Sequence, residues 1–338
     1  MTHMPTRPRL RDVAERAGVS VTLVSSYLNA PHTVSARSRG VIQQAIDDLR
    51  FVPNGAARQL RRGASRFVGF VAYDIGDPLF VSVARGAQER AEQAGLRLVL
   101  ADTDGRLDAE RDYLSLFEEQ QIRGLLLSAV GDCQAYLEEV SALGIPTVLI
   151  DQAVPGDRWP YVIVNDVLGG EMAVGHLLEI GRRRIAVVGG PPLLRQVADR
   201  IAGAHKAVAG VDGATLEVIN TRERTVPAGR EAGRQLSERH PSRRPDAVFC
   251  INDSMATGLV ESLQAAGLQV PKDVAVIGYN DTAATLAAAP LSSIRQPHED
   301  FGRIAIELLL GELGAAPPAP QRQVVLDPEL VIRASTTG

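Results

Sequence analysis

Small side chains that can form hydrogen bonds or apolar contacts are concentrated in residues 10–29, LRDVAERAGVSVTLVSSYLN. The spacing of the apolar residues predicts two short helices separated by a turn at Gly18, and Ser20 is suited to cap the second helix. The exposed face of that helix would carry side chains that fit the base edges of a DNA major groove. These candidates are Ser20, Val21, Thr22, Ser25, Ser26 and Asn29. An ordinary helical hairpin of an enzyme or a helix bundle is the alternative interpretation.

The charges of the chain are divided unevenly between its two parts. Residues 1–66 contain eleven arginines and four carboxylates, a net charge of +7, whereas the remainder carries −11 and the whole chain −4. A basic segment on an acidic body suggests that the segment contacts DNA phosphates, although a solvated basic face would look similar. A third helix is predicted after Ser35, and Arg37 in its first turn is a candidate phosphate contact.

A very short helical segment follows at residues 55–62, with Asn54 as its predicted cap. An isolated helix of this length is unstable in water, so it must fold against a partner. We interpret the segment as a hinge helix that becomes ordered on DNA and inserts Leu60, its only large apolar residue, into the minor groove. Asn54 and Ala57 are the other candidate DNA contacts here. The alternative is a flexible linker with one stray leucine.

From Phe67 onward, short apolar runs alternate with amphipathic helical patterns. This alternation predicts an α/β fold with parallel strands covered by helices on both faces, and the number of strands favours two doubly wound sheets over one. Ligands of such sheets bind beyond the carboxyl ends of the strands, which is where Asn252 and Asn280 fall. We therefore expect these two amides to contact a small molecule, with simple capping of loops as the alternative.

Several classes of protein are disfavoured by what the sequence lacks. No apolar run suits a membrane span, and residues 1–11 are unlike a secretory signal, so a cytoplasmic protein without membrane partners is expected. The two cysteines, Cys133 and Cys250, lie far apart, which favours buried free thiols over a disulfide or a metal site. Common catalytic motifs are missing, so we expect neither an enzyme nor a bound cofactor. A solute-binding protein is disfavoured by the basic segment and the lack of a signal peptide.

The sequence resembles the LacI/GalR family of bacterial transcription regulators over nearly its whole length. The matching segments, in order, are DVAERAGVS, VSARSRGVIQQAIDDLRFVPNGAARQL, GGEMAVGHLLEIGRRRIAVVGGP, DRIAG, CINDSMATG, VPKDVAVIGYND and LSSIRQP. The resemblance implies a helix-turn-helix DNA-binding domain at residues 1–52, a hinge at 53–64, and an effector-binding and dimerisation domain at 65–338. This last domain would have two lobes like those of type I periplasmic binding proteins, with lobe one at about 65–164 and 295–325 and lobe two at about 165–294 and 326–338.

The same resemblance implies effector contacts in the cleft between the two lobes. Arg200 matches an arginine that in this family holds sugar hydroxyls or a carboxylate. Phe80 matches an aromatic residue that lines the pocket, with a place in the core as its alternative. Because arginines exceed the expected carboxylates at this site, an anionic effector such as a sugar phosphate or a sugar acid is our hypothesis. The expected effector contacts are Phe80, Asn165, Arg200, Arg224, Asn252 and Asn280.

The function implied by the resemblance is that of a dimeric repressor of a carbohydrate-utilisation operon. The two helix-turn-helix domains of the dimer would bind a pseudo-palindromic operator in double-stranded DNA. A sugar, sugar phosphate or sugar acid between the lobes would control the affinity of the protein for this operator. Relatives tend to have an arginine at the position of Ser26, so a weaker base preference is expected there. The alternative is a corepressor-dependent regulator that responds to a small molecule other than a sugar.

Overall fold

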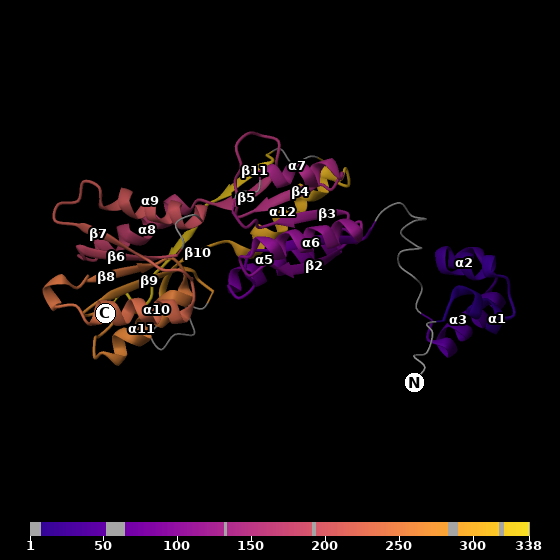
Figure 1. Ribbon diagram of the computed structural model, residues 1–338, viewed down its shortest axis with the longest axis horizontal. Coiled ribbons are helices and arrows are strands. Elements are labelled where there is room, and N and C mark those ends of the chain that lie inside the picture. Colours follow the sequence, from indigo (N-terminus) through magenta and orange to yellow (C-terminus); the bar gives the residue numbers. More distant parts are fainter. Residues whose placement is uncertain are drawn as a thin grey trace. The chain divides into compact units, whose positions relative to one another are not determined.

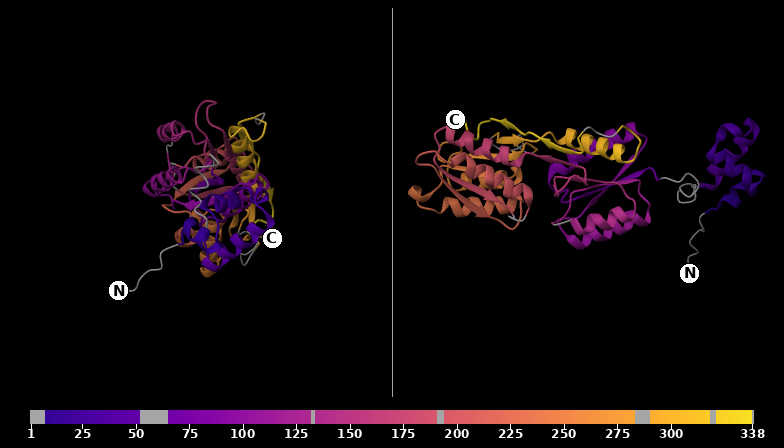
Figure 2. Two further views of the ribbon diagram at one scale, coloured as in Figure 1. Left: turned by 90° about the vertical axis from the view of Figure 1, so that its right-hand side faces the viewer. Right: turned by 90° about the horizontal axis from the view of Figure 1, so that it is seen from above.

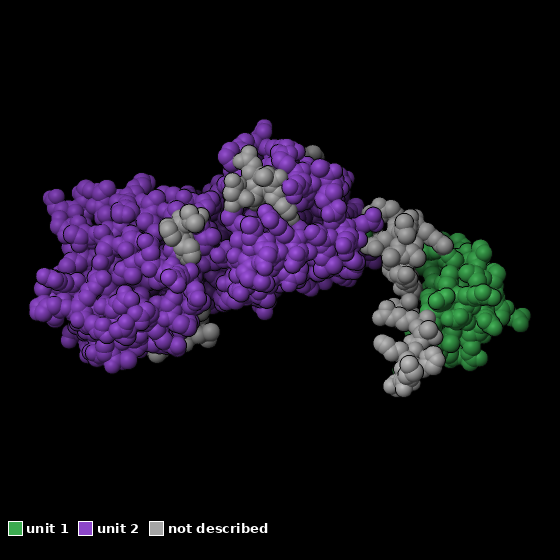
Figure 3. Space-filling model, viewed as in Figure 1, with its two compact units in different colours: residues 1–65 green, residues 66–338 purple. Residues whose placement is uncertain are grey.

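The computed structural model describes residues 8–51, 65–131, 134–190, 194–282, 290–317 and 321–337. The chain forms two compact units, Met1–Ser65 and Arg66–Gly338 (Figure 3). Each unit has its own hydrophobic core, so each can be understood by itself. In the part of the chain that is described, no helix combines the length and the apolar character needed to cross a membrane.

In residues 8–51, the N-terminal unit is built from three α-helices and one short 3-10 turn. They are α1 (Leu10–Ala17), α2 (Val21–Asn29), η1 (Pro31–Thr33) and α3 (Ala36–Leu49). Val13, Val24 and Ile42, one from each α-helix, are completely buried in one shared core. The predicted caps are confirmed, because the side chains of Ser20 and Ser35 each accept a hydrogen bond from the backbone N–H three residues later.

The larger unit contains two lobes, each built on a six-stranded sheet (Figures 1 and 2). Lobe one comprises the sheet with strand order β11-β5-β4-β3-β1-β2 and the helices that cover it. Its strands are β1 (Phe67–Ala72), β2 (Arg97–Asp102), β3 (Gly124–Leu127), β4 (Thr147–Ile150), β5 (Tyr161–Val164) and β11 (Gln323–Leu326). Every pairing in this sheet is parallel, as the alternation of strands and helices predicts.

Helices cover both faces of the sheet in lobe one. They are α5 (Pro78–Gln93), α6 (Leu107–Glu119), α7 (Gln134–Ala142) and α12 (His298–Glu312). Successive residues of β1 point to opposite faces: Phe70 packs in the core with α5 and α12, whereas Val71 packs in the core with α6 and α7. Because both faces are buried, the strand is a continuous apolar run in the sequence.

Lobe two repeats this arrangement with the strand order β12-β10-β9-β8-β6-β7. Its strands are β6 (Arg184–Gly189), β7 (Thr215–Asn220), β8 (Ala247–Cys250), β9 (Ala275–Asn280), β10 (Ser292–Arg295) and β12 (Glu329–Val331). Its helices are α8 (Asp166–Glu179), α9 (Arg195–Val208), α10 (Val226–Ser237) and α11 (Asp253–Ala265), with a 3-10 turn η2 (Pro241–Arg243). Of these strands, β12 runs antiparallel to its neighbour. Cys250 is a buried free thiol as predicted, and Cys133 lies outside the described residues.

The chain passes between the lobes three times: from β5 to α8, from β10 to α12, and from β11 to β12. Figure 2 shows the two lobes side by side with these connections running between them. Residues at the carboxyl ends of both sheets are in contact, since the side chain of Asn280, the last residue of β9, donates a hydrogen bond to Asp77 after β1. The region between the lobes is therefore where a ligand of this fold is expected.

Three pairs of helices cross closely at glycines. The reciprocal pairs are Gly86 with Gly302 in α5 and α12, Gly170 with Gly203 in α8 and α9, and Gly229 with Gly258 in α10 and α11. A Cβ atom at any of these positions would lie within 2.1 Å of a carbonyl oxygen of the partner helix. Only glycine fits at such crossings, so these three helix pairs pack backbone against backbone.

Candidate DNA-binding and effector sites

The turn between α1 and α2 fixes the direction of α2. Gly18 ends α1 in the left-handed conformation with φ 65°, which glycine adopts at little cost. The N–H of Val19 then donates to the carbonyl oxygen of Ala14 at 3.0 Å, and Ser20 begins the next helix. This helix, glycine turn and capped second helix have the form of a helix-turn-helix motif, in which the second helix enters the major groove.

Side-chain hydrogen bonds attach α1 and α2 to α3. The hydroxyl of Tyr27 donates to Oε1 of Gln43 at 2.6 Å, and Nη2 of Arg16 lies 2.7 Å from Oδ2 of Asp48. The hydrogen bond from Gln44, aided by Arg16, lowers the pKa of the exposed Asp48 carboxyl. These polar contacts surround the buried core of the unit and hold the exposed face of α2 in one orientation.

The first turn of α2 presents the side chains that the sequence predicts for base contacts. Ser20, Val21 and Thr22 are exposed, and Val21 is 43% exposed although it is apolar. Ser25 and Ser26, one turn later, are half-buried. An exposed valine beside a threonine suits the methyl group of thymine, and the serine hydroxyls suit either donors or acceptors on base edges.

Two other predicted DNA contacts have clear positions. Nδ2 of Asn29 donates to the carbonyl oxygen of Ser25 at 2.8 Å, so this amide also closes the last turn of α2. Arg37 is exposed in the first turn of α3, as a phosphate contact requires. The remaining predicted contacts lie outside the described residues: Asn54, Ala57 and Leu60.

Asp166, the first residue of α8, is the centre of the site between the lobes. Its completely buried carboxylate accepts hydrogen bonds from Nε of Arg200 at 2.8 Å, from Nη2 of Arg195 at 3.1 Å, and from the hydroxyl of Tyr279 at 3.0 Å. Arg195 also donates to Asp151, which follows β4 in lobe one, at 3.3 Å. A charged network thus crosses from lobe two to lobe one.

Burial and neighbouring charges set the protonation states in this network. Burial, and to a smaller extent the charge of Asp166, raises the pKa of Asp151 to about 6. Burial lowers the pKa of Arg200, but Asp166 and other neighbours raise it above its ordinary value on balance, so this group stays charged. The guanidinium of Arg200 lies 3.7 Å from the ring centroid of Tyr279 and donates to the carbonyl oxygen of Ile251 at 2.7 Å.

The arginines of this network are already paired within the protein. Arg195 binds Asp151, Asp166 and Asp199, and Arg200 binds Asp166. Three carboxylates therefore face two guanidinium groups. Arg224, whose charge also acts on Asp151, is a third guanidinium group here, and the anionic effector stays a prediction.

Arg224 differs from the paired arginines. Its guanidinium lies 5.1 Å from the ring centroid of Tyr73, which follows β1 in lobe one, and its Nη2 is buried without a hydrogen-bond partner among the described residues. Gly190 leaves room for this side chain, since a Cβ there would lie 2.7 Å from its Cγ. Nδ2 of Asn252 donates to the backbone carbonyl of Arg224 at 2.9 Å. The protein thus holds Arg224 in place while one donor stays available to a ligand.

Asn280 links the two lobes directly. Its Nδ2 donates to Asp77 of lobe one at 3.3 Å, and its Oδ1 accepts a hydrogen bond from Nε2 of Gln296 at 2.7 Å. His298 at the start of α12 faces the same region, and burial lowers its pKa. Nε2 of His298 is buried without a hydrogen-bond partner among the described residues, as are Nη2 of Arg224 and Nε of Arg195, so it is another nitrogen that a ligand can contact.

The other predicted effector contacts have structural roles. Phe80 is 2% exposed within the core of lobe one, which agrees with its alternative interpretation as a core residue. Asn165 caps α8 with its side-chain oxygen and donates to Asp327 at 3.2 Å. Asn252 caps α11 as well as holding Arg224, so loop capping describes part of its role.

Of this network only Arg200 is among the effector contacts expected from the sequence. Asp151 directly follows β4, and Asp166 comes two residues after the end of β5, so the rule that ligands bind beyond the carboxyl ends of strands would have indicated both. Tyr279 lies inside β9 and is completely buried, so its pattern is that of an ordinary core residue. Among the residues that the structure describes, no group of three or more His, Cys, Asp or Glu side chains could hold a metal ion.

Comparisons with known proteins agree with the helix-turn-helix unit and with the two-lobed unit. Residues 9–54 match the model of bacterial regulatory proteins of the lacI family, and residues 174–336 match that of a periplasmic binding protein-like domain. The ribose operon repressor of Escherichia coli (strain K12) is 33% identical over 333 residues, which cover 96% of this chain and 99% of that protein.

Solved structures give the same result. The lac repressor dimer bound to operator and the anti-inducer ONPF superposes with a TM-score of 0.82 at 26% identity, covering 98% of this chain and 100% of that chain. The complex of the transcriptional regulator CelR with cellobiose superposes with a TM-score of 0.72 at 29% identity, covering 97% of this chain and 100% of that chain.

The helix-turn-helix unit and the two-lobed α/β unit together define a DNA-binding transcriptional regulator with a periplasmic-binding-protein-like domain. Its relatives are regulators, and the chain is accordingly not an enzyme. The chain belongs to the lacI family of bacterial regulatory proteins.

Proposed function

We propose that this protein is a cytoplasmic, homodimeric repressor of a carbohydrate-utilisation operon, which binds a pseudo-palindromic operator and is controlled by a sugar or sugar derivative between its lobes. The observation that carries the proposal is the exposed first turn of α2, presented after the Gly18 turn on a rigid three-helix unit. In this proposal α2 reads base edges through Ser20, Val21, Thr22, Ser25, Ser26 and Asn29, while Arg37 contacts phosphate.

Selection of binding sites from a random double-stranded DNA library with purified protein, at stated moderate salt, tests the DNA half of the proposal. An inverted repeat is expected, because two identical heads related by twofold symmetry contact two half-sites. Repeating the selection with candidate sugars distinguishes a repressor that is released by its effector from one that requires a corepressor. If no inverted repeat is enriched under any of these conditions, the proposal is contradicted.

Leu60 is proposed to enter the minor groove at the centre of the operator, with Asn54 and Ala57 contacting DNA beside it. Insertion of Leu60 would kink the DNA. Leu60→Ala should abolish this kink and so remove most of the specific affinity, while weak, salt-sensitive binding to DNA persists. Gel-shift titrations of operator and random DNA measure both affinities. Unchanged specific affinity in this variant would exclude the minor-groove wedge.

The effector is proposed to be a polyhydroxylated sugar or sugar derivative bound at the carboxyl ends of the strands. Arg224 and His298 each offer a buried nitrogen without a partner among the described residues, and Asn280 binds Asp77 across the two lobes. We propose that Arg200, Asn165 and Asn252 act mainly by positioning these groups. The similarity to the ribose operon repressor and to the CelR–cellobiose complex supports a sugar.

The charges of the site favour a neutral sugar over a sugar phosphate or sugar acid. Asp151, Asp166 and Asp199 outnumber the two arginines that they bind, so of the arginines named here only Arg224 would pair with a bound anion. Isothermal titration of neutral sugars against their phosphates and acids tests this choice. Tighter binding of the anionic member of a pair would show that Arg224 and not the carboxylates determines specificity.

Exposed apolar side chains support the homodimer. The edge strand β2 of lobe one exposes Val99 and Leu100, and the adjacent helices α5 and α6 expose Val81 and Leu116. An uncovered edge strand with apolar side chains is an unusual surface for a monomer, because it invites pairing with a second chain. We propose that two copies associate through this surface.

A further inference from the structure

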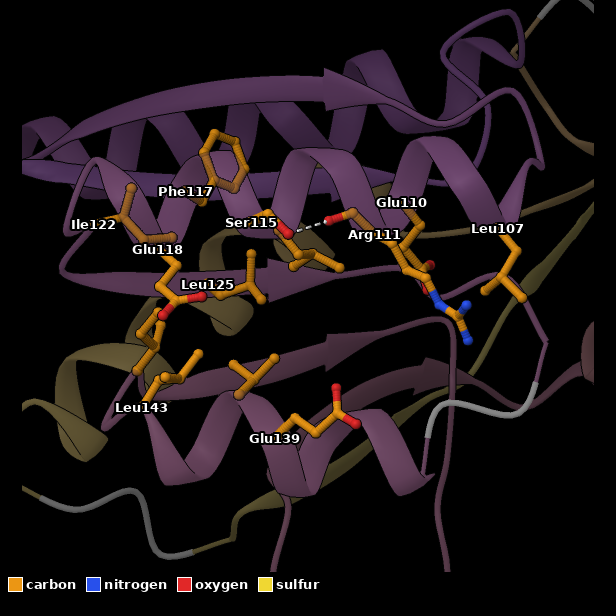
Figure 4. A pocket seen from close by; sticks show the side chains of 13 residues that line it. Leu107, Glu110, Arg111, Ser115, Phe117, Glu118, Ile122, Leu125, Glu139 and Leu143 are labelled. Carbon is orange, nitrogen blue, oxygen red and sulfur yellow. Dashed lines mark hydrogen bonds between the residues drawn. The ribbon is translucent and has the colours of Figure 1, made fainter.

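A cavity of about 540 Å³ lies between α6 and α7 in lobe one (Figure 4). In lobe two, the corresponding helices are α10 and α11, since they occupy the same places between consecutive strands of an identically ordered sheet. Those two helices cross directly at Gly229 and Gly258. The two lobes thus share one plan but differ at this helix pair.

Two side chains on α6 explain the difference. Counted from the start of each helix, Glu110 and Leu114 in α6 stand where α10 has Gly229 and Gly233. Each glycine in α10 lies so close to the neighbouring helix that a Cβ would clash with its backbone. The larger side chains of α6 prevent such an approach, and the space between α6 and α7 stays open.

The cavity has an apolar floor and a mainly acidic rim. Its apolar lining includes Leu114, Phe117, Ile122, Leu125, Val140 and Ile145. In Figure 4 the side chain of Glu139 projects from α7 toward the cavity, with Glu118 at one end and Arg111 at the other. Eight of the thirteen lining residues are apolar and five are polar or charged, and a pocket of this volume has the size of small-molecule sites in proteins.

The charges of the rim are only partly balanced. Oε2 of the buried Glu110 accepts a hydrogen bond from the N–H of Val130 at 2.7 Å; burial raises the pKa of this carboxyl, and the nearby Arg111 partly offsets the shift. Glu118 and Glu139 form no side-chain hydrogen bond or ion pair with any other described residue. One guanidinium therefore faces three carboxylates, and Glu139 is the unpaired group that points into the cavity.

We propose that the cavity between α6 and α7 is a second ligand site, which binds a small molecule with an apolar body and a cationic amine. The apolar body would cover the floor formed by Leu125 and its neighbours, and the ammonium group would bind Glu139. The site is separate from the effector site, because α6 and α7 pack on the face of the sheet opposite to α5 and α12, whereas the effector residues follow the strand ends.

Three matched probes test the site on the full-length protein: phenylbutylamine, phenylbutanol and phenylbutyrate. They share one apolar body and differ in the charge of the terminal group. Titrations followed by saturation-transfer NMR should show the amine binding about fivefold more tightly than the alcohol, a factor expected for one half-exposed ion pair, and the carboxylate binding most weakly. Equal affinities, or no binding of the amine, would overturn the proposal.

Variants locate the binding. Glu139→Gln should lower the affinity for the amine about fivefold and leave that for the alcohol unchanged, because it removes charge and keeps shape. Ser115→Trp, at an exposed position that lines the cavity, should block all three probes by filling the space. Glu89→Gln, an exposed position on α5, is the matched control and should change nothing. Thermal unfolding and operator binding verify that each variant is folded.

Two other outcomes would contradict the proposed ligand site. Amine binding that is unaffected by both Glu139→Gln and Ser115→Trp places the ligand elsewhere and refutes the site. If a helical peptide of leucine and lysine binds in a manner sensitive to Ser115→Trp while the amine does not bind, the cavity is a groove for a basic protein helix, and the small-molecule proposal is wrong.

Discussion

The carboxylate of Asp166 binds two arginines and a tyrosine while its own side chain is completely shielded from water. Burying such a charged group costs free energy, and removing it costs more, because the arginines that it paired then stay buried without a counter-charge. The stability of lobe two and the orientation of Arg200 therefore depend on this one residue.

Asp166→Asn should lower the free energy of unfolding by about 3 to 5 kcal/mol, because Arg200 stays buried without its counter-charge. Urea unfolding of purified protein measures the loss. Asp108→Asn is the matched control, since Asp108 pairs with Arg106 at 3.5 Å on the surface, and it should cost less than about 1 kcal/mol. Similar losses in both variants would show that the buried network contributes little.

The raised pKa of Asp151 gives a pH dependence with a definite sign. Its pKa of about 6 exceeds the ordinary value of 3.8, so the folded protein holds this proton more tightly than the unfolded chain does. The contribution of Asp151 to stability is therefore greatest at low pH, falls as the pH rises between about 4 and 6, and is constant above that range.

Asp151→Asn lacks this titration. The stability of the variant relative to the original protein should therefore increase as the pH rises from about 4 to 6 and then level off. Chemical unfolding at several pH values measures the difference, and the exposed Asp157→Asn should show no such trend. A difference that is independent of pH would mean that the carboxyl of Asp151 has the same pKa in the folded protein as in the unfolded chain.

Among the elements, the crossing of α8 and α9 is one of three that leave no room for a methyl group. A Cβ on Gly170 would lie 2.1 Å from the carbonyl oxygen of Arg200, whereas a Cβ on Gly175 in the same helix meets nothing within 4 Å. Gly170→Ala should therefore destabilise the protein by about 1 to 3 kcal/mol, and Gly175→Ala should stabilise it by up to about 1 kcal/mol. Denaturant unfolding of both variants measures the contrast, and a gain in both would mean that the helices separate freely.

Elements with a local pattern were predictable from the sequence. The first two helices follow from the helical spacing of the apolar residues around Val13 and around Val24. The turn follows from Gly18 and the start of α2 from Ser20, and all of these signals lie within a few residues of one another. The two parallel sheets follow from apolar runs such as 67–72 in the same way. Local periodicity and capping decide these features, so no distant contact was needed.

Features that depend on distant contacts were not predictable. Phe80 and a pocket-lining aromatic have the same local pattern, and only the packing of α12 on α5 places Phe80 in the core. Asp166 meets Tyr279 across more than a hundred residues of sequence, so nothing near either residue indicates the pair. The open cavity beside α6 likewise appears only when Glu110 is compared with Gly229 in the other lobe.

At the scale of the whole molecule, the exposed edge of lobe one predicts the state of association. Val99→Asp on β2 should weaken the proposed homodimer by placing a charge in an apolar interface, with the monomer appearing at micromolar concentration in sedimentation velocity. Val325→Asp is the matched control, because Val325 is exposed on β11 at the opposite edge of the same sheet. If only Val325→Asp dissociates the dimer, the interface lies at the β11 edge and the proposed surface is wrong.

The position of β11 and β12 at the edges of the two sheets also bears on biosynthesis. Both strands follow all other described elements along the chain, so a ribosome makes them last of these, when lobe one and lobe two still lack one strand each. Until then the nascent protein leaves the edges of β5 and β10 unpaired, which exposes it to aggregation. Both lobes are therefore completed within the same few seconds of translation, and a regulator with one finished lobe and one unfinished lobe exists only briefly in the cell.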